Sequence, residues 1–196
     1  MKKGSSMVGL RDLVYSVLDT DDKTGATYGE VKPFAPAISA SVNTGQESAT
    51  QYADNGPIDV ITQTGETTLT VGTNEIIDEV LAEILGQTLT KGVIAYKQDV
   101  TPPWVAFGFK GTKANGEEKF VWLTKGRFSI PSNELNTKTQ QPNFQDASIT
   151  GTFIRRDYDE VFKITGDTDA EEFADFKDLF FEEVFDLSLL NTTPEN

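Results

Sequence analysis

The stretch from residue 102 to residue 130 constrains the fold more than any other part of the chain. It alternates aromatic or β-branched residues with small or polar ones on both sides of a polar segment at residues 114–117. This alternation predicts two long antiparallel strands joined by a tight turn. A hairpin this apolar is not stable with its face in water, so we expect it at the centre of a sheet or at a shared assembly surface. Its large side chains, Trp104, Phe107 and Trp122, are candidate core anchors.

β-type patterns fill most of the remaining chain, which predicts a mainly β fold built as a single domain over residues 1–196, with its core at about residues 8–165. The clearest exception is the segment 73–85, where apolar residues recur along one helical stripe and Gly86 ends the pattern. We therefore expect a helix laid against the sheet. Ile77 and Leu81 lie on its stripe and are further candidate core anchors.

The acidic residues are concentrated near the C-terminus. The formal net charge is −14, and from Asp157 onward thirteen acidic residues accompany only two lysines. The segment 167–187 combines this acidity with closely spaced phenylalanines, which predicts a helix packed on the outside of the fold, followed by a flexible tail at 188–196. Strong acidity argues against ordinary binding to DNA or to anionic membranes. It remains compatible with a conduit through which DNA slides without sticking.

The residue types exclude most catalytic chemistry. The chain has no cysteine and no histidine, so it lacks thiolate nucleophiles, disulfides, structural zinc sites and the usual general base. We predict no catalytic residues, no cofactor and no metal. The stretch 19–30 has the acidic spacing of a calcium-binding loop. However, Lys23 stands where such a loop needs a calcium ligand, and Thr24 stands where it needs a glycine. An ordinary polar turn is favoured there, and also for the acidic group Asp157, Asp159 and Glu160.

Two long polar segments, at 43–57 and 131–143, have no apolar periodicity and are expected to be loops. Loops of this length usually carry function. The apolar runs are too short to cross a bilayer, and no secretory h-region follows the N-terminus, so a protein made in the cytoplasm and not bound to a membrane is expected.

Several short strings resemble the major tail tube proteins of long-tailed bacteriophages. They occur in the same order as in that family over about 150 residues, and agreement of this kind across many positions is a better test than any single match. The strings are Gly9-Leu-Arg-Asp-Leu-Val-Tyr15, Tyr52-Ala-Asp-Asn55, Leu69-Thr-Val71 with the following helix to Gly86, Pro102-Pro-Trp-Val-Ala-Phe-Gly-Phe109, Phe120-Val-Trp-Leu-Thr-Lys-Gly-Arg-Phe128, Thr137-Lys138 and Ser148-Ile-Thr-Gly-Thr-Phe153.

The resemblance implies a β-sandwich flanked by a helix, with extended loops and terminal arms. Subunits of that family form hexameric rings whose strands build a shared barrel, and the rings stack into a tube for DNA delivery. The implied partners are the protein itself, a tape-measure protein and tail terminator or distal tail proteins, and the implied location is the virion tail after assembly in the host cytoplasm. Candidate ring-stacking residues in the two polar loops are Gln46, Tyr52, Asp54, Asn55, Asn136, Lys138 and Gln141.

Two other functions stay open at this point. A tube or ring component of a related contractile injection or secretion system would use a similar fold. A carbohydrate-binding β-sandwich could present Trp104 and Trp122 as stacking platforms, although their place within alternating apolar strands favours core packing. The hypothesis of a hydrolase based on paired carboxylates has less support, because no feature of the sequence selects one acidic pair over the others.

Overall fold

The fold is built almost wholly from strands. A computed structural model describes residues 4–53, 56–132, 147–173 and 176–191. The strands within them are β1 (Met7–Asp22), β2 (Gly25–Tyr28), β3 (Lys32–Pro33), β4 (Ala37–Ala53), β5 (Gly56–Thr73), β6 (Thr88–Thr90), β7 (Val93–Ala95), β8 (Val105–Lys113), β9 (Glu118–Phe128), β10 (Ala147–Ile154) and β11 (Lys163–Asp167). One α-helix, α1 (Asp78–Leu85), and three short 3-10 helices, η1 (Glu171–Phe173), η2 (Leu179–Phe181) and η3 (Leu187–Asn191), accompany them.

The predicted hairpin is the centre of the main sheet. In the described part of the chain, nine strands form one antiparallel sheet in the order β2-β1-β8-β9-β10-β5-β4, with β3 beside β1 and β11 beside β9. Phe107 of β8 lies opposite Leu123 of β9. The turn between these strands includes Gly116 at a φ of 88°, a left-handed conformation that glycine adopts without strain. The hairpin and its central position are confirmed.

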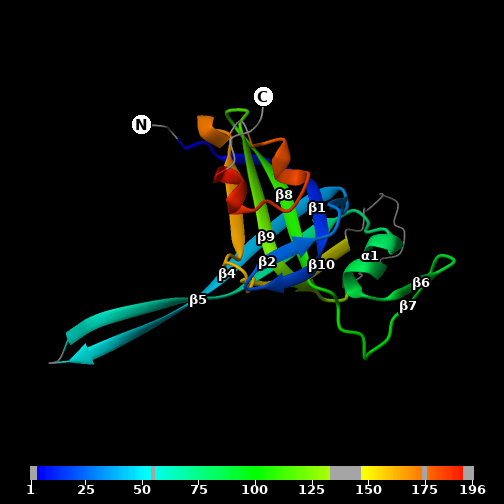
Figure 1. Cartoon of the computed structure of the whole chain (residues 1–196), viewed down its shortest axis with the longest axis horizontal. Helices are drawn as coiled ribbons and strands as arrows, with labels where there is room; N and C mark the ends of the chain where they lie inside the picture. Colours follow the sequence, from blue (N-terminus) through cyan, green and yellow to red (C-terminus); the bar gives the residue numbers. More distant parts are fainter. Residues whose placement is uncertain (1–3, 54–55, 133–146, 174–175, 192–196) are drawn as a thin grey trace, which may run out of the picture.

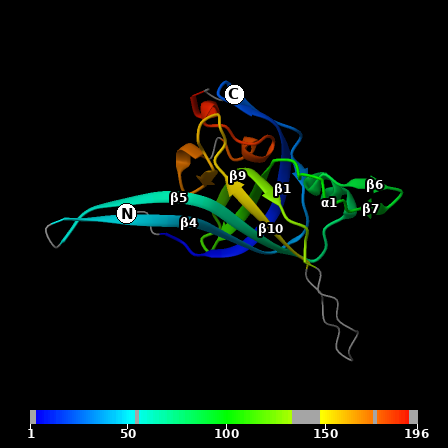
Figure 2. The ribbon, with the colours of Figure 1, turned by 90° about the horizontal axis from the view of Figure 1, so that it is seen from below.

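One face of the sheet encloses the larger core. The sheet curls so that β1 and β4, which are distant in the strand order, approach each other. Phe107, Leu123 and Phe153 are fully buried between the two layers, and α1 closes the core with Val80 and Ile84. The mainly β fold flanked by a helix is therefore confirmed, and its two layers belong to one continuous curled sheet (Figure 2).

The other face of the sheet carries a second core, which the C-terminal segment covers. Phe120 and Trp122 of β9 pack there against Phe180, Val184 and Phe185. Trp122 is fully buried, and its indole Nε1 donates a hydrogen bond of 2.7 Å to the carbonyl oxygen of Phe180. The segment lies along the β8–β9 hairpin in Figure 1, drawn in orange and red.

The C-terminal segment is not the single helix that its phenylalanine spacing predicts. After β11 ends at Asp167, the helical elements among the described residues up to 191 are only η1, η2 and η3. Aspartate and phenylalanine are weak helix formers, so packing decides the backbone here, and short turns allow more rings to reach the sheet than one helical stripe would. The tail predicted as flexible from residue 188 begins with η3, and residues 192–196 lie outside the described part.

The helix is shorter than its sequence pattern predicts. It spans Asp78–Leu85 rather than 73–85, because Thr73 is the last residue of β5 and Ile77 is extended, with φ −66° and ψ 147°. Ile77 is 55% exposed and is therefore not a core residue, whereas Leu81 packs half-buried against the larger core. Gly86 ends the helix in a left-handed conformation, as expected. In the described residues no helix is long and apolar enough to span a bilayer.

The polar segment 43–57 is a long hairpin rather than a loop. β4 and β5 pair from Ala37 opposite Thr73 out to Ala53 opposite Gly56. The outer half projects from the body of the molecule as a two-stranded ribbon (Figures 1 and 2). Both of its faces are in solvent, so neither face needs apolar residues, and the alternation that marks a half-buried strand is missing from the sequence.

Candidate assembly surfaces

The arm is the outer part of the β4–β5 hairpin, defined as residues 45–53 and 56–66. At its base, Thr67, Leu69 and Val71 are buried in the body of the fold. Beyond the base, residues 45–51 and 58–66 are all exposed. Both strands have entered solvent by Gly45 and Gly65, and cross-strand pairing continues to the end of the arm. Residues 45–51 and 58–66 of the arm thus contribute nothing to the core of their own chain.

The two faces of the arm differ in charge. Residues directly opposite each other in an antiparallel pair share a face. Val60 lies opposite Thr50, and the next pairs on that face, Ser48–Thr62 and Gln46–Thr64, are also uncharged. The other face holds Ile61 opposite Ala49, together with the acidic residues Glu47 and Asp59. A partner would therefore meet a β-branched, uncharged surface on one side and an acidic surface on the other.

The arm exposes large apolar side chains. Ile58, Val60 and Ile61 are 61%, 58% and 67% exposed. A two-stranded ribbon is marginally stable in water when it stands alone, and clustered exposed apolar groups are typical of protein interaction sites. These features identify the arm as a surface suited to contact with another chain.

The candidate ring-stacking residues fall in different places. Gln46 is exposed on the arm, and Tyr52 belongs to β4 near the end of the arm. Asp54 and Asn55 lie outside the described residues. The same holds for the three candidates of the second polar segment, Asn136, Lys138 and Gln141.

A second projection lies at the opposite end of the molecule. The β6–β7 hairpin, residues 87–97, stands apart from the main sheet, and both views place it at the far end from the arm (Figures 1 and 2). Its turn holds Lys91 at φ 51° and Gly92 at φ 78°, the two left-handed residues of a tight hairpin turn. At its base, the backbone N–H of Lys97 donates to Oε1 of Gln87 at 3.0 Å. Val93 and Tyr96 are exposed on it.

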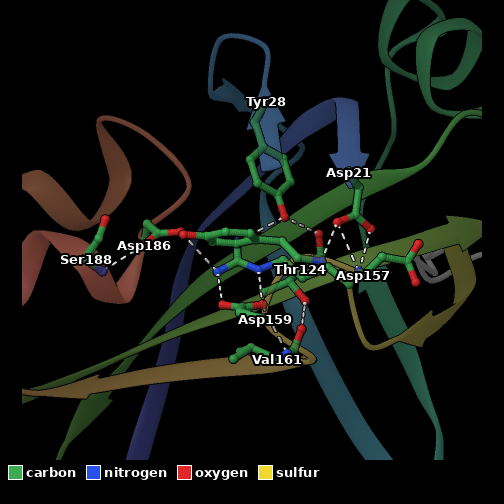
Figure 3. A network of polar contacts seen from close by, with 10 residues as sticks. Asp21, Tyr28, Thr124, Asp157, Asp159, Val161, Asp186 and Ser188 are labelled. Carbon is green, nitrogen blue, oxygen red and sulfur yellow. Dashed lines mark hydrogen bonds and ion pairs between the residues drawn. The ribbon is translucent and has the colours of Figure 1, made fainter. Parts of the chain in front are cut away.

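A buried arginine ties the C-terminal segment to the sheet (Figure 3). Arg156 follows β10 and is 1% exposed. Its Nε and Nη2 donate to the two carboxylate oxygens of Asp159 at 2.7 and 2.6 Å, and Nη2 also lies 3.3 Å from the Asp186 carboxylate. Nη1 donates to the hydroxyl of Tyr28, which donates to the carbonyl oxygen of Thr124 at 2.9 Å. Burial by itself would lower the pKa of Arg156, but the bonds to Asp159 and Tyr28 outweigh it and raise the pKa.

A lysine joins two further acidic residues beside this network. Nζ of Lys125 lies 2.7 Å from Asp21 and 2.8 Å from Asp157. Asp21 also accepts hydrogen bonds from the backbone N–H groups of Asp157 and Tyr158. Burial alone would raise the pKa of Asp21, yet the bonds from Lys125 and the two N–H groups outweigh it, so the pKa is lowered.

The acidic stretches weighed as cation sites have structural roles. Asp21 and Asp157 bind Lys125, and Asp159 binds Arg156. Asp22 accepts a hydrogen bond of 2.7 Å from the backbone N–H of Thr24, so the polar turn predicted there is confirmed. Across residues 4–53, 56–132, 147–173 and 176–191, no cluster of three acidic groups is placed to hold a metal ion.

Asp21 should give the stability of the fold a specific acid dependence. Its pKa is lower in the folded chain than in the unfolded chain. Its contribution is therefore complete above the unfolded value of about 4 and is lost as the pH falls through the folded value. We expect Asp21→Asn to destabilise the protein at pH 7 and to differ progressively less from the wild type below about pH 4. Thermal unfolding from pH 7 to pH 3 measures this, with the exposed Asp19→Asn as control. A difference that stays constant across that range would contradict the assignment.

Neither tryptophan offers an open platform for a sugar. Trp122 is fully buried. Trp104 is half-buried just before β8, and the guanidinium of Arg127 lies 3.8 Å from the centre of its ring, with Nζ of Lys125 at 5.2 Å. These contacts are cation–π interactions that fix the ring in place. The structure therefore gives no support to a carbohydrate-binding function.

Comparison with known proteins finds distant structural likeness alone. No family model matches the sequence. No curated protein matches it either. The chain is similar to one in the sheath–tube complex of an extracellular contractile injection system, in the extended state, with a TM-score of 0.44, 12% identity, and coverage of 79% of this chain and 87% of that one. It is also similar to a chain in the tube-terminating cap of the anti-feeding prophage, with a TM-score of 0.41, 10% identity and the same coverage values. At these identities and TM-scores, neither likeness assigns the chain to a family.

Proposed function

We propose that this protein is a structural tube subunit, whose copies associate into stacked rings that form a conduit. The observation that carries the proposal is the arm. Some twenty residues leave the core of their own subunit and expose Ile58, Val60 and Ile61 to solvent. An element with no partner in its own chain is suited to a partner in another copy, and contacts between different surfaces of identical subunits close into rings or extend into stacks.

The residue content and the acidity support a passive role for the tube. With neither cysteine nor histidine, the chain is poorly equipped for catalysis and well suited to structure. The chain is acidic overall, with a net charge of −14, and this disfavours adhesion of DNA to its surface. In this proposal the rings are hexameric, and strands of neighbouring subunits continue one another around the lumen. The further partners are a tape-measure protein and tail terminator or distal tail proteins. The location is the virion tail.

Two settings fit this function, and one partner distinguishes them. The sequence resemblance favours the tail tube of a long-tailed phage, which lacks a sheath. A tube of a contractile injection system works inside a sheath. Co-expression with the proteins encoded next to this one, followed by purification of the tube, separates the settings: a sheath bound along the tube favours the contractile system, and a bare tube favours the long-tailed phage.

Removing the arm tests the proposed function. Residues 46–64 are replaced by an Asn-Gly turn between Gly45 and Gly65, which keeps the buried base of β4 and β5. Because residues 46–51 and 58–64 are exposed, we expect the shortened chain to fold with a melting temperature close to that of the wild type and to form no rings or tubes. Negative-stain microscopy over a concentration series measures assembly, and circular dichroism measures folding. Tubes formed by the shortened chain at wild-type concentrations would overturn the role of the arm.

A further inference from the structure

The two projections of the molecule carry opposite charge. The sequence from 45 to 66, which includes the arm, contains four acidic residues and no basic residue. Residues 87–97, which form the β6–β7 hairpin, contain Lys91 and Lys97 and no acidic residue. The only charged residues of the β6–β7 hairpin are therefore basic, and the hairpin stands at the end of the molecule opposite the acidic arm (Figure 1).

The charges on both projections are available to a partner. Lys91 and Lys97 are exposed, and neither forms an ion pair with another described residue. The same holds for Glu47, Asp59 and Glu66 of the arm. By contrast, six other basic side chains, those of Arg11, Lys32, Lys110, Lys113, Lys125 and Arg156, are bound to acidic residues with at least one member of each pair partly or fully buried.

Resting on the proposed function, we propose that the arm of one copy docks on the β6–β7 hairpin of the next copy. Each surface offers exposed apolar groups as well as charges. On the arm, Ile61 lies on the face that holds Glu47 and Asp59, and Val60 is exposed on the other face. On the hairpin, Val93 and Tyr96 are exposed. Apolar contact supplies the favourable burial, while opposite charges fix the register and exclude arm-to-arm pairing, which would bring acidic residues together.

This contact fits a head-to-tail assembly. The arm and the β6–β7 hairpin lie at opposite ends of the long axis, so they cannot meet within one chain (Figures 1 and 2). Because they are different surfaces, the contact can repeat from copy to copy, and in a ring or stack each copy gives its arm to one neighbour and accepts an arm from another. The tight Lys91–Gly92 turn keeps the acceptor hairpin narrow and presents Lys91 at its tip.

Charge reversal on each surface tests the contact. One variant carries Lys91→Glu and Lys97→Glu, and a second carries Glu47→Lys and Asp59→Lys. Each alone places like charges at the contact, so we expect the protein concentration required for assembly to rise about tenfold in low salt, and less at about 1 M salt, where charges are screened. An equal mixture of the two variants should assemble near the wild-type concentration, because each arm then finds an acceptor of opposite charge. Lys23→Glu with Lys177→Glu is the control, since both lysines are exposed and lie outside the two projections.

Cross-linking gives a second readout that does not require tubes. The chain has no cysteine, so Thr62→Cys on the arm and Thr90→Cys on β6 introduce single thiols. A short bismaleimide should join the two variants in a mixture far more often than it joins either variant to itself.

The outcomes separate the contact from the proposed function. If the wild type forms tubes and the Lys91→Glu, Lys97→Glu variant matches the control, the contact is overturned and the tube function stands. If the wild type forms no rings or tubes even with its tail neighbours, the proposed function fails, and the cross-link alone decides the contact: a mixed product supports it, and no mixed product overturns it.

Discussion

Trp122→Ala is expected to lower the free energy of unfolding by about 3–5 kcal/mol, the cost typical of removing a large buried aromatic side chain. The indole is fully buried in the second core, with its ring centre 5.4 Å from that of Phe181. It packs so closely over β8 that a side chain at Gly108 would meet it at 2.9 Å. The substitution leaves a cavity, and it leaves the carbonyl oxygen of Phe180 without its donor. Urea unfolding followed by far-UV circular dichroism measures the loss.

Two further variants separate the contributions of Trp122. Trp122→Phe keeps a six-membered aromatic ring and removes the five-membered ring with its N–H donor, so it should cost less than Trp122→Ala. Trp104→Ala removes a side chain that is half-buried and stacked on Arg127, and it should also cost less. Equal losses for Trp104→Ala and Trp122→Ala would contradict the placement of Trp122 as the anchor of the second core. Because the second core holds the C-terminal segment, Trp122→Ala should also reduce assembly.

Arg156→Met is expected to cost about 3 kcal/mol, at the lower end of the range for breaking a buried ion pair. The side chain of Arg156 is 1% exposed. Its guanidinium forms ion pairs with Asp159 and Asp186 and a hydrogen bond with the hydroxyl of Tyr28. Methionine fills a similar space without charge, so both carboxylates lose their partner. The cost stays at the lower end because Asp159 and Asp186 are 22% and 28% exposed and keep contact with water.

The neighbouring residue provides the matched control. Arg155 is 66% exposed and pairs at 3.1 Å with Glu160, which is 73% exposed, so Arg155→Met should change stability by no more than about 0.5 kcal/mol. Limited proteolysis gives a second measurement. Arg156→Met releases Asp186, and the C-terminal segment should then be cut faster than in the wild type or in Arg155→Met. Equal cleavage in all three proteins would mean that Arg156 does not hold the segment.

The sequence predicts the part of the fold that is most buried. The alternation of large apolar residues with small or polar ones predicts the β8–β9 hairpin, and in the structure both of its faces are covered, with Phe107 and Leu123 in one core and Trp122 in the other. The part of the arm within 43–57 shows no alternation of apolar and polar residues, so the sequence predicts a loop there instead of paired strands. The threonines, valines and isoleucines of the arm are strand formers, but composition without period does not separate a solvated hairpin from a polar loop.

Tertiary packing explains the other differences. Phe173, Phe176 and Phe180 have the spacing of one face of a helix. In the structure their rings pack against the sheet, and Phe173 and Phe180 belong to short 3-10 helices. Ile77 continues the apolar stripe of α1 but belongs to the extended segment before it. Arg155 and Arg156 are adjacent in the sequence, and the sequence does not indicate which of the two is buried. The burial of Arg156 depends in part on its contact with Asp186, which lies thirty residues away in the sequence.

The position of the C-terminal segment has a consequence for synthesis of the chain on the ribosome. The outer face of the β8–β9 hairpin is complete once β9 has emerged, but the side chains that cover Phe120 and Trp122 come from residues 173–185. Domains begin to fold while translation continues, at roughly 5–20 residues per second. Each nascent chain therefore displays a bare aromatic face until Phe185 has emerged. A chain that stops short of Phe185 would keep that face open to aggregation, so translation errors upstream of Phe185 should give insoluble products.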